Sequence, residues 1–351
     1  MAAPLEIDWL PSSRIGDLQA FLEAEWRAEH VLARDAELLR WQHPRGDDEL
    51  SFVAATERGE LVGVLGVIPV EFGVRGDRLS GAWLTTWAVT PAARARRVGL
   101  QLLELALECH DFVGTIGGNA TTMTILGALR FQTRSAVPRW IRPLDRTELA
   151  HFVGEIPDAP ESPAGDGFTV REWRAADASD WNLYWEGTLA SRLVGVCRDA
   201  RYLEWRYLSH PRFDYRVEIA EAQTGEPAGL LVHRLERASG GEMTVLRIVD
   251  ALGEGLAVAA LALHVAERGR RIGAAFADFY CTSQHAARPL ETAGFVAESA
   301  LGLEFPSRFQ PFEPGSRPLT AAFRLASQNT EQLTGSDVYF TRSDCDQDRP
   351  S

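Results

Sequence analysis

The sequence contains no lysine: all 36 residues counted as Lys or Arg are arginine. This absence excludes Schiff-base chemistry and a lysine clamp on a phosphate, because both need a primary amine on a side chain. Long apolar runs are also absent, and none reaches the roughly 18 residues of a membrane-spanning helix. The N-terminal residues lack the basic and then apolar pattern of a secretory signal. We therefore expect a cytoplasmic protein with no membrane partner.

Cysteine is scarce as well. The four cysteines lie far apart and form no CxxC pair: Cys109, Cys197, Cys281 and Cys345. This spacing argues against a zinc site and against a disulfide framework, so we expect reduced thiols and no metal. The net charge of −13 argues against broad binding to nucleic acid, whose phosphates need a concentrated positive face, but it suits a small cationic substrate.

A segment rich in Pro, Gly and acidic residues divides the chain of 351 residues nearly in half. That segment, GEIPDAPESPAGDG, is typical of an extended linker, and the length exceeds one ordinary domain. We expect an N-terminal domain over residues 1–150, a linker over 151–167 and a C-terminal domain over 168–351.

The two halves resemble each other at a nearly constant offset. The run DAELLRW, residues 35–41, has a counterpart in DARYLEW, residues 199–205, and each run is followed by a His-Pro pair. Hairpin patterns with a glycine turn recur in the same order. We interpret the pattern as a tandem duplication with diverged halves.

Hydrophobic periodicity in the first half predicts alternating strands and helices. The expected strands are Leu5–Trp9, Ser51–Glu57, Leu61–Gly73, Gly81–Val89 and Val113–Gly117. The expected helices are Ile15–His30, Asp35–Trp41, Leu100–His110 and Thr121–Leu129. Hairpins followed by crossover helices indicate an α/β (α+β) fold with two tandem domains, each a mixed, mostly antiparallel sheet with helices on both faces.

One turn stands out between an apolar strand and an amphipathic helix. Residues 89–99 read VTPAARARRVG, with three arginines and a glycine. Unpaired amides and the positive end of the helix dipole favour an anion at a helix N-terminus, above all a phosphate. Arg94, Arg96 and Arg97 add charges that pair with such an anion, and Gly99 allows close backbone approach. An arginine-rich solvated loop is the alternative interpretation.

The same run resembles the acyl-CoA-binding signature of the GNAT superfamily of N-acyltransferases, Val-x-Pro-x-x-Arg-Gly-x-Gly-x-Gly/Ala before a leucine-rich helix. The residues that match are Val89, Pro91, Arg94, Gly99 and Leu102. Ala95 and Arg97 replace the first two glycines of the signature. A second signature of this superfamily, Asn-x-x-Ala-x-x-x-Tyr-x-x-x-Gly-Phe, is matched at Asn119 and Phe131. With its two halves, the chain resembles tandem transferases of bacterial surface-polysaccharide or amino-sugar biosynthesis.

This resemblance implies acetyl-CoA or another acyl-CoA as co-substrate. It places the pantetheine arm along the backbone of Ala88 and Val89, the diphosphate among the amides of residues 96–100, and the thiol beside Asn119. The implied coenzyme-binding residues are Ala88, Val89, Arg94, Ala95, Arg96, Arg97, Val98, Gly99, Leu100, Asn119 and Thr122. The matching run of the second half, VDALGEGLAVAAL, has no arginine, so we expect no coenzyme site there.

The expected proton donor and base are missing from the first half. Leu126 replaces the tyrosine that often protonates the leaving thiolate in this superfamily, and the strand of residues 81–89 carries no acidic residue. Asp250, at the end of the apolar strand VLRIVD, is a candidate base from the second half, with capping of the following helix as its alternative role. Asp250 and Asn119 are therefore the candidate catalytic residues.

Other polar residues are weaker candidates. His43 and His210 fit a shared turn better than catalysis. The alternating aspartates near the C-terminus lack the glycine and glutamate of a calcium loop: Asp344, Asp346 and Asp348. We expect them to lie in a solvated tail, with anchoring of a substrate ammonium as the alternative.

We expect an N-acyltransferase that acts on a primary amine of a small molecule, as a monomer or weak homodimer. Arg134, Arg139 and Arg142 would bind the phosphates of the preferred acceptor, a nucleotide-linked amino sugar. An aminoglycoside or polyamine is the competing acceptor and suits the acidic composition. A non-catalytic binding protein on a degenerate scaffold is the alternative from another class. Transfer of an amino acid from charged tRNA is a lesser alternative, which the acidic surface disfavours.

Overall fold

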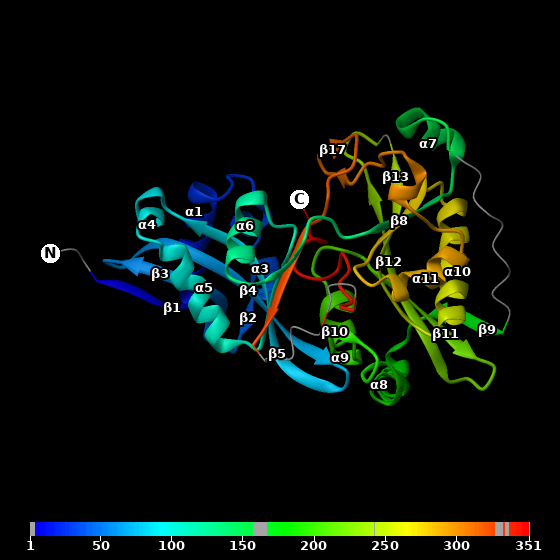
Figure 1. Cartoon of the computed structure of the whole chain (residues 1–351), viewed down its shortest axis with the longest axis horizontal. Helices are drawn as coiled ribbons and strands as arrows, with labels where there is room; N and C mark the ends of the chain where they lie inside the picture. Colours follow the sequence, from blue (N-terminus) through cyan, green and yellow to red (C-terminus); the bar gives the residue numbers. More distant parts are fainter. Residues whose placement is uncertain (1–3, 157–166, 242, 327–332, 334–336, 351) are drawn as a thin grey trace.

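Two β-sheets form two lobes that lie side by side (Figure 1). The structure, a computed structural model, describes residues 4–156, 167–241, 243–326, 333 and 337–350. None of the helices among these residues is long and apolar enough to cross a membrane. Most of the expected linker, residues 157–166, lies outside the described residues.

The first sheet is antiparallel apart from one pair of strands, β5 and β6. Its strands in spatial order are β1 (Leu5–Pro11), β3 (Glu49–Glu57), β4 (Glu60–Val74), β5 (Asp77–Val89), β6 (Phe112–Ile116), β18 (Ala321–Leu325) and β7 (Gln132–Arg134). Two short strands extend it, with β2 (Pro44–Arg45) on β3 and β10 (Val194–Val196) on β4.

The second sheet repeats this order and also has one parallel pair, β13 and β14. Its strands in the matching order are β9 (Phe168–Glu172), β11 (Arg216–Ala222), β12 (Pro227–Arg237), β13 (Thr244–Gly253), β14 (Phe276–Tyr280), β8 (Arg139–Pro143) and β15 (Val296–Ala297). A separate hairpin joins β16 (Arg308–Phe309) to β17 (Phe312–Glu313). The predicted fold class, mixed and mostly antiparallel sheets with helices, is confirmed.

Each sheet takes its sixth strand from the other half of the chain. β8 precedes the expected linker but pairs with β14 and β15, and β18 belongs to the second half but pairs with β6 and β7. The expected boundary at residue 150 therefore does not coincide with the division between the sheets. Each exchanged strand lies between two strands of the sheet that the other half of the chain forms.

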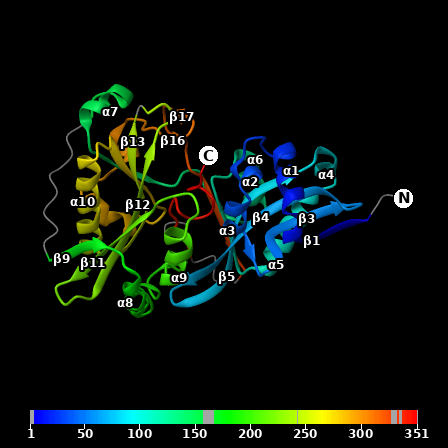
Figure 2. The ribbon, with the colours of Figure 1, turned by 180° about the vertical axis from the view of Figure 1, so that it is seen from behind.

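Helices cover the sheets through their apolar faces. In the first half these are α1 (Ile15–Glu25), α2 (Val31–Arg34), α3 (Ala36–Gln42), α4 (Pro91–Ala95), α5 (Val98–Cys109), α6 (Ala120–Ala128) and α7 (Arg146–Val153). Buried leucines of α5 pack on one face of the first sheet, and those of α1 and α3 pack on the other. α5 lies in front of the sheet in Figure 1, and α1 lies in front of it in the reverse view of Figure 2.

The second half has a longer outer helix. Its helices are α8 (Ala178–Tyr184), α9 (Ala200–Leu203), α10 (Gly255–Arg271), α11 (Gln284–Thr292) and α12 (Glu298–Leu301). Short 3₁₀ turns span Ser12–Arg14 and Ala175–Asp177, and π turns span Trp185–Leu189 and Glu204–Leu208. α10 packs on the outer face of the second sheet, away from the first lobe (Figure 1).

The two tryptophans that mark the repeated run meet at the junction of the lobes. Trp41 and Trp205 stack with ring centroids 5.5 Å apart. Each indole N–H donates to the backbone carbonyl of the other residue at 3.2 Å. The contact is reciprocal, as expected for equivalent positions of two similar halves.

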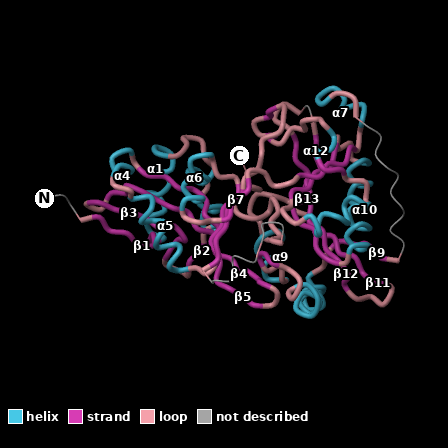
Figure 3. Tube along the Cα trace, viewed as in Figure 1, coloured by secondary structure: helices cyan, strands magenta, loops and turns pink. Residues whose placement is uncertain are grey.

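The C-terminal segment, residues 337–350, is buried between the lobes. The prediction of a solvated tail is therefore wrong. The segment runs as loop in Figure 3 and contains Asp344 and Asp348, which are 1% and 2% exposed. The Asp344 carboxylate accepts from Arg198 at 2.8 Å, and that of Asp348 accepts from Arg234 at 2.6 Å. Local composition predicts solvent exposure, but buried arginines of the second half provide the partners that such carboxylates need.

The exchange of strands makes a prediction about independent folding. We expect fragments 1–150 and 168–351, each lacking its sixth strand, to show no sharp thermal transition by circular dichroism. The full chain should unfold in a single cooperative transition. Mixing the two fragments is the control, because it restores both strands to their partners. A fragment 1–150 that melts cooperatively near the temperature of the full chain would contradict this prediction.

Candidate functional site

The first sheet opens where β5 separates from β6. β5 pairs with β6 only over residues 81–83, whereas it follows β4 as far as Val89. A bulge on β5 accompanies the opening: Leu84 pairs with Val67 and Trp87 with Leu65, which leaves residues 85 and 86 opposite a single residue of β4. Bulges of this kind re-aim side chains and are frequent beside active sites.

A cavity of about 240 Å³ lies at this opening. β5, β6, the start of α6, the turn after α1 and the C-terminal segment form its wall. The polar residues that line it are His30, Thr85, Thr86, Thr115, Asn119, Thr122, Asp346, Gln347 and Arg349. The cavity therefore combines residues from both ends of the chain.

Several buried polar atoms in this wall have no hydrogen-bond partner in the part of the chain that the structure describes. Neither ring nitrogen of His30 forms a hydrogen bond within the described residues, although His30 is only 4% exposed. The hydroxyls of Thr85 and Thr86, at the bulge, are also buried without a partner there. Buried polar groups are nearly always hydrogen-bonded, so a cluster of unpaired ones beside a cavity points to a ligand.

His30 reaches the cavity because α1 is shorter than expected. The helix predicted through His30 ends at Glu25, and residues 26–30 form a turn in which the His30 N–H donates to the Arg27 carbonyl at 3.0 Å. Burial lowers the pKa of His30 to about 4, with repulsion from Arg349 adding to the shift and Asp346 opposing it. The imidazole is therefore neutral near pH 7, and one of its ring nitrogens can accept a hydrogen bond.

Asn119 and Leu126 occupy neighbouring parts of the same wall. The Asn119 side chain accepts from the Thr122 N–H at 2.9 Å and thereby caps α6. Leu126 is fully buried and lines the cavity without a polar group. The cavity thus brings together Asn119, Thr122 and Leu126, three residues singled out from the sequence.

The arginine turn, residues 89–99, contains more regular structure than the sequence indicates. Thr90 caps a short helix, α4, with Pro91 at its first position, and α5 begins at Val98. Between them Arg97 adopts φ +59°, in the left-handed region that favours glycine. Arg97 stands where the signature noted above has a glycine, so its backbone conformation fits that signature although its side chain does not.

Fewer amides are free at this turn than expected. The N–H groups of Arg96, Arg97 and Leu100 donate to backbone carbonyls within the turn at 3.0–3.1 Å, so three of the five amides expected to surround a diphosphate are already paired. Val98 and Gly99, the first two residues of α5, have no backbone partner for their N–H groups within the described residues. These two amides, with the helix dipole behind them, remain for an anion.

The guanidinium groups of the turn differ in their contacts. Arg94 donates to the Val89 carbonyl at 3.3 Å, and Arg96 forms an ion pair with Glu57. Arg97 is exposed and has no ion pair or hydrogen bond of its side chain within the described residues. Gly99 lets α5 pack on β5: a Cβ there would lie 3.0 Å from Nε1 of Trp87.

The structure corrects the assignment of Asp250 as a base. Its side chain is fully buried in the second lobe and does not line the cavity. The carboxylate accepts from Arg198 at 2.8 Å, Tyr207 at 2.7 Å and Tyr339 at 2.6 Å. It does not cap α10 either, whose N-cap is Glu254. The strand pattern places Asp250 correctly at a strand end, but it does not show the buried arginine that binds it.

Two of the three arginines expected to bind nucleotide phosphates are engaged within the protein. Arg139 is 4% exposed and donates to Asp278 at 2.7 Å, and Arg142 donates to the Ala293 carbonyl. The prediction of a phosphate site on these residues is therefore wrong for Arg139, whose charge is neutralised in the core. Asp278, which is 1% exposed, has a structural role as the partner of Arg139.

His43 and His210 are structural, as their repeated position indicates. His43 is fully buried with Nδ1 3.0 Å from the Val67 carbonyl, and burial lowers its pKa to about 4. Nδ1 of His210 accepts from the N–H groups of Arg212 and Phe213. Both rings hold turns between elements.

The second sheet opens in the same way. β13 pairs with β14 only over residues 245–248, and a cavity of about 440 Å³ lies at its free end, beside the start of α10. Arg192 and Arg288 line this cavity, but they come from other elements than the turn before α10. The expected lack of a coenzyme site in the second half stays a prediction.

A comparison with protein families finds a match in the first half of the chain. Residues 14–127 match the family model described as an acetyltransferase (GNAT) domain. No curated protein matches the chain. The matched region contains β5, the arginine turn, α5 and Asn119, which together form one side of the candidate site.

Solved structures with the same fold include two N-acyltransferases and one protein described as a probable N-acyltransferase. A probable N-acyltransferase of Enterococcus faecalis has a TM-score of 0.57 at 13% identity over 93% of this chain and 74% of that chain. A GCN5-related N-acetyltransferase of Anabaena variabilis has a TM-score of 0.60 at 14% identity, over 92% of this chain and 73% of that chain. The N-myristoyltransferase of Saccharomyces cerevisiae, solved with bound myristoyl-CoA, has a TM-score of 0.54 at 13% identity, over 93% of this chain and 80% of that chain. The chain thus contains a region similar to the GNAT domain, within a fold shared with N-acyltransferases.

The buried histidines predict how stability depends on pH. The pKa of His30 and that of His43 are about 4 in the folded protein and about 6.5 when unfolded, so the unfolded state binds more protons between these values. Their contribution is complete above pH 6.5 and is lost as the pH falls toward 4. We expect the free energy of unfolding to drop by about 2 kcal/mol per histidine between pH 7 and pH 5.

Urea unfolding followed by tryptophan fluorescence at the two pH values measures this loss. The His30→Gln variant should show a smaller loss than the unchanged protein by about the share of one histidine. An equal loss in both proteins would contradict the assigned pKa of His30.

Proposed function

We propose that this chain is an acyl-CoA-dependent N-acyltransferase that transfers an acyl group, such as acetyl, to a primary amine of a small molecule. One observation carries the proposal: β5 opens away from β6 beside the start of α5, and the cavity in that opening holds buried polar groups, next to Asn119, that have no partner among the described residues. The family likeness of residues 14–127 and the fold shared with N-acyltransferases support it.

In this proposal the coenzyme lies across the opening. Its diphosphate binds at the first turn of α5. There the amides of Val98 and Gly99 and the guanidinium of Arg97 have no partner among the residues that the structure describes. The pantetheine arm follows the edge of β5 that β6 leaves unpaired, and the thioester enters the cavity beside Asn119. Arg96 contributes only if it exchanges Glu57 for a phosphate.

The chemistry requires a neutral amine, a polarised thioester carbonyl and a proton for the leaving thiolate. The free hydroxyls of Thr85 and Thr86 are donors that can stabilise the oxyanion formed when the amine attacks. Leu126 has no proton to give, so the thiolate takes its proton from another group or from solvent. This makes the enzyme dependent mainly on positioning and on the removal of a proton from the amine.

The proposal extends to the organisation of the chain and to the acceptor. A tandem duplication is supported by the matching strand order of the two sheets and by the reciprocal contact of Trp41 with Trp205. A nucleotide-linked amino sugar loses support because Arg139 and Arg142 are engaged within the protein. A cationic amine, such as a polyamine or an aminoglycoside, suits the net charge of −13.

A binding protein without catalysis is the second candidate. Leu126 favours it. This apolar residue lines the cavity at the position where the GNAT superfamily often has the tyrosine that protonates the leaving thiolate. Such a protein would bind the coenzyme and release it unchanged. The two candidates therefore differ in turnover and not in coenzyme binding.

Calorimetric titration with acetyl-CoA tests the coenzyme site. We expect Arg97→Glu to lower the affinity about tenfold, because one charge-assisted pair becomes a repulsion. Arg97→Gly should lower it less, since glycine accepts the positive φ and removes only the charge. Arg75→Glu is the matched control, because Arg75 is another exposed arginine with positive φ, in the β4–β5 turn away from the site.

Each outcome of the titration decides between the candidates. Binding that weakens in Arg97→Glu and is unchanged in Arg75→Glu supports the coenzyme site. Thiol release from acetyl-CoA in the presence of an amine then supports the transferase, and binding without thiol release for a panel of amines supports the second candidate. No heat and no thermal shift with acetyl-CoA would overturn both.

A further inference from the structure

We infer that Asp346 and His30 form the subsite for the acceptor amine, and that in this structure the Arg349 guanidinium occupies the position of the acceptor's cationic group. The inference rests on the proposed N-acyl transfer, because it names the acceptor class of that same cavity. It adds three residues to the site, two of them from the C-terminal segment of the chain.

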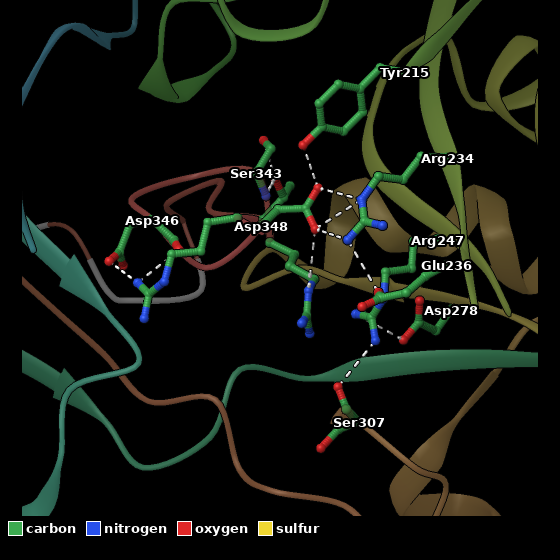
Figure 4. Close-up of polar contacts among 12 residues, drawn as sticks. Tyr215, Arg234, Glu236, Arg247, Asp278, Ser307, Ser343, Asp346 and Asp348 are labelled. Carbon is green, nitrogen blue, oxygen red and sulfur yellow. Dashed lines mark hydrogen bonds and ion pairs between the residues drawn. The ribbon is translucent and has the colours of Figure 1, made fainter. Parts of the chain in front are cut away.

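Asp346 differs from the aspartates on either side of it. Asp344 and Asp348 bind arginines that lie 146 and 114 residues away in the chain, and they hold the segment in the second lobe. Asp346 lines the cavity of the first lobe, and its charged partner is Arg349, three residues on. In Figure 4 Asp346 lies on the far side of the segment from Asp348, Arg234 and Tyr215.

Among the described residues, the Arg349 side chain forms hydrogen bonds and an ion pair with Asp346 alone. Its guanidinium pairs with the Asp346 carboxylate and donates to the Asp346 carbonyl at 3.1 Å. The side chain is 30% exposed, whereas that of Asp346 is 7% exposed. A buried carboxylate thus holds a cation that can swing into solvent, which is the arrangement expected of a site whose occupant is replaced by a cationic substrate.

His30 lies beside this pair. The charges of both Asp346 and Arg349 act on its imidazole, and all three residues line the same cavity. Its two nitrogens have no partner within the described residues, so one of them is free to accept a hydrogen bond from the amine. Trp26, which is 42% exposed, also lines this cavity, and aromatic rings attract cations.

The proton balance follows from this placement. The acceptor enters as an ammonium and replaces Arg349 at Asp346. Burial and the charge of Arg349 lower the pKa of His30 and Asp346 raises it, so the departure of Arg349 makes His30 a stronger base. The ammonium then gives one proton to His30, which becomes an imidazolium. The neutral amine attacks the thioester carbonyl, so that a C–N bond forms and the C–S bond breaks. The thiolate takes the second proton of the nitrogen, and His30 returns its proton to solvent. One amide, one thiol and one released proton result.

The cavity restricts the shape of the acceptor. Its volume of about 240 Å³ also has to hold the end of the thioester, so it admits an amine on a slender arm and not a whole nucleotide sugar. A polyamine, whose other positive charges stay outside, fits this description. Spermidine is therefore the probe, titrated into the full chain with coenzyme A present.

The Arg349→Ala variant tests the subsite most directly. Removal of the internal cation should tighten spermidine binding about tenfold, and Arg349→Lys, which keeps the cation, should bind as the unchanged protein does. Arg324→Ala, at an exposed arginine on β18, is the control. Asp346→Asn should weaken spermidine binding at least tenfold, and the double variant with Arg349→Ala should bind no better than Asp346→Asn alone.

A catalytic role of His30 has its own readout. His30→Gln should lower kcat for acetyl transfer to spermidine by about a hundredfold with little change in KM, since it removes the proton acceptor and leaves Asp346 in place. An unchanged kcat would show that His30 does not take the proton. Circular dichroism of each variant verifies that it is folded.

Coenzyme titrations in the same variants separate this inference from the proposed function. Unchanged affinity for acetyl-CoA, together with spermidine affinities of Arg349→Ala and Asp346→Asn within twofold of the unchanged protein, would overturn the subsite alone. No binding of acetyl-CoA by the unchanged protein would overturn the proposed function.

Discussion

The buried ion pairs of the C-terminal segment are the interaction on which the candidate site depends. The segment is bound to the second lobe on both sides of Asp346, through the pairs Asp344–Arg198 and Asp348–Arg234. Between these two pairs, Cys345 and Gln347 contact the first sheet. Loss of one partner would leave an uncompensated buried charge, which is far more costly than a lost surface pair. These two ion pairs therefore position residues 345–349 at the opening between β5 and β6. Asp346, Gln347 and Arg349 of this segment then form part of the polar wall of the cavity.

The exchange of strands has a related consequence. Because β8 and β18 cross between the lobes, the strand beside β6 in the first sheet comes from the second half, and the two halves cannot separate without taking a strand from each sheet. A cavity shared by two lobes would otherwise change shape with any hinge motion. Here the exchanged strands tie the lobes together, and the cavity is lined by His30 of the first lobe and by Asp346 of the segment that the second lobe holds. Such preorganisation is what a site that works mainly by positioning requires.

Local patterns in the sequence predicted much of the fold and part of the site. Asn119 lies at a strand end before a helix, and capping is a local interaction, so its position could be predicted from neighbouring residues. The strand exchange could not, because the pattern of β8 does not show which sheet it joins. The partners of Asp250 and Asp344 lie 52 and 146 residues away, and composition alone suggested exposure for the latter. His30 was missed because a single histidine at the end of a helical pattern has no distinguishing neighbours.

The central claim is that the opening between β5 and β6 holds the thioester end of a coenzyme while the C-terminal segment shapes the place of the amine. A crystal structure of the full chain with coenzyme A bound tests it most directly. The account predicts the diphosphate at the first turn of α5 and the sulfur in the cavity beside Asn119 and His30. A coenzyme seated at the opening of the second sheet, with the first cavity empty, would contradict it.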